Sequence, residues 1–70
     1  MEVFSKRLRE LRKSRKMSQQ ELSIKTHISQ SNISSYELGQ NKPTIDAIIA
    51  LCKFFNVSAD YLIGLSDDLI

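Results

Sequence analysis

The apolar positions at the start of the chain fall on one side of a helix. Phe4, Leu8 and Leu11 stand at i, i+4 and i+7, the spacing that brings side chains onto one face of an α-helix. This stripe predicts a first helix over roughly 2–15 with its apolar side turned to a core. Three basic residues fall on the opposite face and are expected to be solvated: Lys6, Arg9 and Lys13.

Two capping signals then follow in close succession. Ser18 is a favourable N-cap, and Glu21 three residues later completes a capping box, which predicts a second helix that begins at Gln19. Ser29 is another N-cap eleven residues beyond Ser18, so the second helix has about two turns and a short connection near 26–28. Two short helices joined in this way are typical of a helix-turn-helix, whose second helix enters the DNA major groove.

The third helix, roughly 30–38, is polar on its outer side. Ile33 and Tyr36 are expected to point to the core. Five uncharged residues face away: Gln30, Ser31, Asn32, Ser34 and Ser35. Amides and hydroxyls read base edges, and glutamine pairs with adenine through two hydrogen bonds, so Gln30 is the first candidate for direct readout. For the serines, a plain solvated helix surface is the alternative.

The last third of the chain predicts two more helices. Thr44 caps a fourth helix, which Asn56 closes in the left-handed region. Ser58 caps a fifth helix over 59–63, stopped by Gly64. Five apolar residues at helical spacing in the fourth helix are assigned to the core, without need of a cofactor site: Ile45, Ile48, Ile49, Cys52 and Phe55.

Length and composition indicate one small domain. The chain has 70 residues, which we divide into a core of about 4–64 and a C-terminal tail of 65–70. The one cysteine, Cys52, excludes an internal disulfide and is expected to act as a small buried hydrophobe. No Cys/His cluster predicts a metal site, no cofactor is expected, and no apolar run is long enough for a membrane span. We therefore expect a cytoplasmic protein.

The charge is unevenly distributed along the chain. Residues 1–16 carry seven Lys or Arg against two Glu, whereas residues 44–70 carry one Lys against four Asp. A basic N-terminal part suits a protein that meets a polyanion there and keeps its acidic end away. An ordinary solvated amphipathic helix explains the same charges, so this signal is weak by itself.

Three segments together resemble a known family. They are LRKSRKMSQQEL, ISQSNISSYELGQNKPT and IDAIIALCKFFNVSADYL. The stretch from about Leu8 to Leu62 resembles the lambda-repressor-like (Cro/C1, xenobiotic-response-element) helix-turn-helix family of phage and bacterial repressors. The resemblance implies an all-α, compact five-helix domain in which helices 2 and 3 form the helix-turn-helix.

The resemblance also implies roles for individual residues. In the family, a basic residue at the position of Arg12 pairs with an acid near the end of the recognition helix, so the resemblance implies an ion pair between Arg12 and Glu37. His27 stands where the family commonly has glycine, in a turn that favours positive φ. Four residues are implied to contact base edges: Gln30, Ser31, Asn32 and Ser35. Six are implied to contact DNA phosphates: Gln19, Ser29, Ser34, Tyr36, Asn41 and Lys42.

The leading interpretation is a sequence-specific double-stranded DNA-binding regulator, expected to be a repressor that binds a twofold-symmetric operator as a homodimer. Apolar residues in excess of what a small core absorbs predict the dimer interface: Phe54, Tyr61, Ile63 and Leu65. The alternative is a helix-turn-helix antitoxin or adaptor that acts mainly through a protein partner. An enzyme is not expected, because the sequence offers no nucleophile–base pair, metal spacing or phosphate-binding loop.

Overall fold

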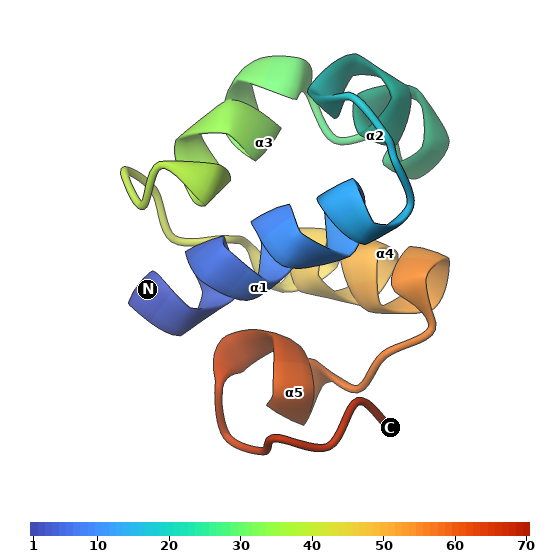
Figure 1. Cartoon of the computed structure of the whole chain (residues 1–70). Coiled ribbons are helices and arrows are strands. Elements are labelled where there is room, and N and C mark those ends of the chain that lie inside the picture. The colour runs from blue at the N-terminus through green and yellow to red at the C-terminus, as the bar shows by residue number, and fades with distance from the viewer.

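Five helices form the fold, and the predicted all-α class is confirmed. The computed structural model describes all 70 residues. The helices are α1 (Glu2–Ser14), α2 (Gln19–Thr26), α3 (Gln30–Glu37), α4 (Ile45–Phe55) and α5 (Ala59–Ile63). In Figure 1, α2 and α3 lie on one side of α1, whereas α5 and the C-terminus lie on the other. None of these helices combines the length and the apolar character that crossing a membrane requires.

Side-chain caps start α2 to α5, as the sequence predicts. The side-chain oxygen of the residue before each helix accepts the N–H of its third residue. The caps are Ser18, Ser29, Thr44 and Ser58. At Ser18 the box is complete, because the Ser18 N–H donates to the Glu21 carboxylate at 2.9 Å. The hydrogen bonds from the Ser18 backbone and hydroxyl lower the pKa of Glu21. This stabilisation is therefore present at neutral pH and is lost as the pH falls through the lowered pKa.

Left-handed residues end the helices. His27 closes α2 at φ 60° and Asn56 closes α4 at φ 56°, both as predicted. Gly64 closes α5 at φ 92°, and a Cβ there would lie 2.9 Å from Cγ1 of Val3. Glycine is therefore required at this position by both conformation and space. Lys16, at φ 56°, was not foreseen as left-handed.

Replacing His27 by glycine is expected to raise the free energy of unfolding by about 0.5–1 kcal/mol, because a β-carbon in the left-handed region costs about 1–2 kcal/mol. His27 is exposed, so no packing is lost. Chemical unfolding followed by circular dichroism measures the change. The matched control is Lys25→Gly within α2, which should lower stability by about 1 kcal/mol. An H27G variant less stable than the wild type would contradict the strain at this turn.

The core gathers ten buried apolar side chains from all five helices and the α2–α3 turn. Phe4 and Leu8 of the predicted stripe are fully buried, and Leu11 packs at the edge of the core. Phe4 meets Tyr36 of α3 edge to face, with ring centroids 5.7 Å apart. This contact fixes α3 against α1 through the side of α3 that is not polar.

The predicted core face of α4 was partly wrong. Ile45 is 75% exposed and Ile49 is 47% exposed, whereas Ala47, Leu51 and Phe55 are buried. These three residues also repeat at i, i+4 and i+8. Because α4 is apolar on nearly every side, periodicity alone did not select the face. The contacts of α4 with α2 and α5 decide it.

The residues after α5 fold back onto the domain. The N–H of Ser58 donates to the carbonyl of Leu69 at 2.7 Å, and two further N–H groups donate to the carbonyl of Asp60. Arg7 of α1 holds this segment from the other side. Its guanidinium donates to the carbonyls of Tyr61 and Ser66 and lies 4.2 Å from the Tyr61 ring centroid. The predicted tail thus lies against the face of the domain opposite α2 and α3.

Candidate nucleic-acid interface

Helix α3 divides cleanly into an inner and an outer side. Ile33 and Tyr36 are buried. On the outer side, Gln30, Ser31 and Asn32 are exposed, and Ser34 and Ser35 are half-buried. The side chains of Gln30 and Asn32 make no hydrogen bond within the chain, since the cap at this end uses the Asn32 backbone N–H and the Ser29 hydroxyl. The outer side is therefore free to meet hydrogen-bonding groups of another molecule.

The turn before α3 is held by two side chains of α2. Ser23 Oγ donates to the carbonyl of Ile28 at 2.6 Å, across the turn. The buried Thr26 hydroxyl donates to the carbonyl of Leu22 within α2 at 2.7 Å, and it accepts the N–H of Ile28 in the turn at 3.4 Å. With His27 in the left-handed region, these bonds fix the direction in which α3 leaves α2.

The Glu37 carboxylate joins three parts of the chain at the end of α3. Arg12 of α1 reaches it with two donors, Nε to Oε2 at 2.7 Å and Nη2 to Oε1 at 2.9 Å. The third donor, Nη1, reaches the carbonyl of Met17 at 2.7 Å. Gln19, the first residue of α2, donates its amide to Glu37 Oε1 at 3.2 Å. The expected partners Arg12 and Glu37 are thus brought together, and Gln19 joins them.

This ion pair is largely withdrawn from water. The Arg12 and Glu37 side chains are 12% and 5% exposed. The hydrogen bond to Glu37 raises the pKa of Arg12, although desolvation opposes the shift. The opposite charges of the Arg12 guanidinium and the Glu37 carboxylate, joined by two hydrogen bonds, compensate each other. The C-terminal end of α3 therefore presents little net charge.

The loop after α3 begins with a helix-ending turn. Gly39 adopts φ 75°, and the N–H of Gln40 returns to the carbonyl of Ser35 at 2.9 Å. Asn41 and Lys42, predicted phosphate contacts, follow and are exposed. Gln19 and Ser34, two further predicted phosphate contacts, line a small groove between α1, α2 and α3. The structure therefore places these four predicted phosphate contacts near the C-terminal half of α3 and in the loop that follows it.

Other predicted site residues are less open. Tyr36 is 4% exposed, so little of it can meet a phosphate. Among the predicted dimer residues, Phe54 and Tyr61 are half-buried under Arg15 and Arg7. Ile63 is also half-buried, whereas Leu65 is 74% exposed. The domain itself absorbs part of the apolar excess that the sequence predicted for an interface.

The contacts of the arginines in α1 and at its C-cap, Arg15, were only partly foreseen. Arg7 and Arg12 bond inward as described above, and Arg15 donates to the carbonyls of Phe54 and Phe55 at the end of α4. A cation at a helix C-terminus satisfies free carbonyls and the helix dipole. These contacts join residues that are 39 and 54 positions apart in the sequence, and no local signal indicates such pairs. Part of the positive charge of this segment is therefore used in contacts within the domain.

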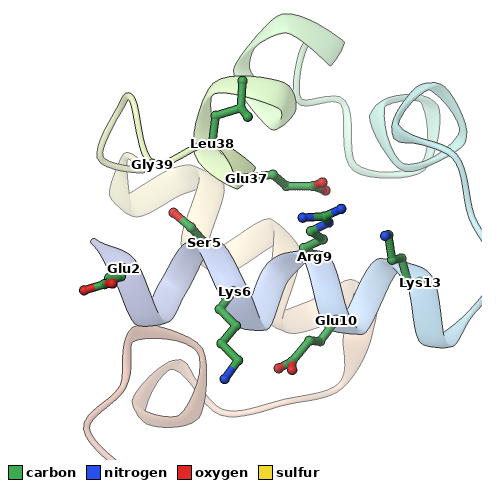
Figure 2. A pocket seen from close by; sticks show the side chains of 9 residues that line it. All are labelled: Glu2, Ser5, Lys6, Arg9, Glu10, Lys13, Glu37, Leu38 and Gly39. Atoms are coloured by element: carbon green, nitrogen blue, oxygen red, sulfur yellow. The ribbon is translucent and has the colours of Figure 1, made fainter.

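A groove between α1 and the end of α3 is shown in Figure 2. Arg9 and Lys13 point from α1 toward the α3 side, whereas Lys6 and Glu10 point away from it. Arg9 also lines the adjoining groove that holds Gln19 and Ser34. Arg9 and Lys13 are exposed, as expected. The rotation of α1 about its axis also turns both toward the α3 side, which the apolar stripe did not indicate.

No cluster of three or more His, Cys, Asp or Glu side chains comes together in the structure. Burial raises the pKa of the Cys52 thiol, which disfavours the reactive thiolate. The polar outer side of α3, where Gln30 and Asn32 are exposed, suits recognition of another molecule.

A family model described as helix-turn-helix matches residues 8–62. The chain belongs to the helix-turn-helix family. The matched residues include all of α2 and α3 and the Arg12–Glu37 pair. The resemblance stated from the sequence is confirmed, and membership in this family agrees with the expectation that the chain is not an enzyme.

Several curated proteins are similar to this helix-turn-helix chain. It is 38% identical to the uncharacterized HTH-type transcriptional regulator YobD of Bacillus subtilis (strain 168), over 94% of this chain and 59% of that protein. It is 39% identical to the HTH-type transcriptional regulator ImmR of the same organism, over 87% and 48%. The HTH-type transcriptional activator BcrR of Enterococcus faecalis is 30% identical, over 87% of this chain and 30% of that protein.

The chain spans less than two thirds of the length of each of these relatives. No solved structure matches it at a significant level.

Proposed function

We propose that this chain is a cytoplasmic, sequence-specific double-stranded DNA-binding transcription regulator that inserts α3 into the major groove. The observation that carries the proposal is the outer side of α3, where Gln30 and Asn32 are exposed and unpaired. Uncharged amides that are free to pair are suited to base edges. The similarity to proteins named HTH-type transcriptional regulators supports the same conclusion.

The proposed contacts fall into two groups. Gln30, Ser31, Asn32 and Ser35 read bases, while Gln19, Ser29, Ser34, Asn41 and Lys42 hold phosphates and fix the register. Tyr36 is left out because its side chain is buried. Arg12 and Glu37 hold α3 at its angle without touching DNA.

The proposed assembly is a homodimer on a twofold-symmetric operator. Two copies of α3 then enter successive major grooves about 34–36 Å apart. Helix α5 lies on the side of α1 away from α3 (Figure 1). Leu65 follows this helix and is exposed, and Val3 lies beside Gly64 at the same end of α5. We place the dimer contact there, including the half-buried Ile63. Repression follows from occupancy alone, because a bound dimer excludes other proteins from its site.

Selection of bound sequences from a pool of random duplexes tests this function. The proposal expects a consensus of two half-sites related by a twofold axis. A consensus without symmetry would contradict the dimer, and recovery of unenriched sequence would contradict specific DNA binding altogether.

Replacing Gln30 by alanine is expected to reduce the preference for the selected duplex over random duplex by about tenfold or more, because one bidentate base contact is worth about 1–3 kcal/mol. Fluorescence anisotropy with both duplexes measures the ratio of affinities. Gln20→Ala is the matched control, since Gln20 is an exposed amide on α2. An unchanged ratio in Q30A would remove Gln30 from the reading residues.

A further inference from the structure

The cations of α1 and of its C-cap, Arg15, divide into those that bond within the domain and those that do not. Arg7, Arg12 and Arg15 are engaged in contacts within the domain. Arg9 and Lys13 are exposed and form no ion pair within the chain. Figure 2 shows both pointing to the α3 side of α1, with Arg9 next to Glu37. These two side chains therefore carry uncompensated positive charge on the α3 side of the molecule.

The surroundings of Arg9 identify what this charge faces. Arg9 lines the groove that also contains Gln19 and Ser34, two residues assigned above to phosphate contacts. Glu37 lies in the same groove, but its carboxylate is 5% exposed and is neutralised by Arg12. An anion that approaches Gln19 and Ser34 consequently meets the Arg9 guanidinium without an opposing free charge.

We propose that Arg9 and Lys13 bind DNA phosphates along the flank of α3, which makes α1 part of the DNA interface. The assignment rests on the proposed function, because it requires α3 to lie in the major groove of the DNA. The two cations then meet the phosphate backbone that borders the major groove, and they add affinity without reading sequence. Lys6 points to the other side of α1 and takes no part.

The test compares alanine variants of the two residues with Lys6→Ala, which removes the same charge from the same helix. Affinity is measured by fluorescence anisotropy over a range of salt concentrations, on the selected duplex and on a random duplex of equal length. In a dimer each variant removes two phosphate contacts, so R9A and K13A should make the slope of log K against log[salt] shallower by about 1.8. At physiological salt, each variant should lose affinity for both duplexes by the same factor, about tenfold or more.

Two further results separate the interpretations. Arg9→Lys keeps the charge and should retain most of the slope, whereas K6A should leave the slope at the wild-type value. Equal slopes in R9A, K13A and K6A would overturn the assignment while the proposed function stands. A loss confined to the selected duplex would also overturn it, since that result indicates base readout. Absence of duplex binding by the wild-type chain would overturn the proposed function and this assignment together.

Discussion

Replacing Arg12 by alanine is expected to lower the free energy of unfolding by about 3 kcal/mol, since removal of one partner leaves the other as an unpaired buried charge. Glu37 would remain with a 5% exposed side chain and no cation, and the carbonyl of Met17 would lose its donor. A domain of this size has only about 3–5 kcal/mol in reserve. R12A should therefore be largely unfolded at temperatures where the wild type is folded.

Urea unfolding followed by circular dichroism measures this loss, and Arg9→Ala is the matched control. Arg9 is an exposed arginine on the same helix, so its removal should change stability by less than about 0.5 kcal/mol. The double variant R12M/E37L removes both charges and should recover most of the stability. An R12A variant as stable as R9A would show that the pair contributes little to the fold.

Affinity for the selected duplex is expected to fall about 10³-fold between about 50 and 200 mM salt. Three cations on each subunit are assigned to phosphates: Arg9, Lys13 and Lys42. A dimer then neutralises about six phosphates, which gives a slope of log K against log[salt] of about −5. Without the α1 residues, two phosphates would remain, the slope would be about −2 and the loss only about tenfold.

Titrations by fluorescence anisotropy at several salt concentrations give this slope directly. Lys42→Ala should reduce it by the same amount as R9A, because each variant removes one cation per subunit. A wild-type slope near zero would exclude phosphate contacts as a major source of affinity.

The local features of the fold were predictable from the sequence. Ser18, Ser29, Thr44 and Ser58 each cap a helix through atoms three residues away, so the signal lies within one turn of chain. The left-handed conformation of His27 was implied by the resemblance to the family, in which glycine is common at this position, and not by a local signal. The division of α3 into inner and outer sides was predictable, because Ile33 and Tyr36 stand three residues apart and the residues around them are polar.

The remaining features depend on tertiary packing. The buried side of α4 was not predictable, because the exposed Ile45 and Ile49 are at least as apolar as the buried Ala47 and Leu51. The direction of Arg9 and Lys13 depends on how α1 is rotated against α3. The contacts of Arg7 reach a segment 54 to 60 residues away, and nothing near Arg7 in the sequence indicates them. Such pairings are set by topology rather than by local chemistry.

The exposed side chains of Gln30 and Asn32 on the outer side of α3 support nothing else in the molecule. Gln30 and Asn32 make no internal hydrogen bond, whereas the tilt of the helix is set by Glu37, Ser23 and the buried ring of Tyr36. Exchanges at the outer positions should therefore leave the scaffold intact. Under the proposed function, operator preference can then evolve, or be reprogrammed by substitution, without a change of fold.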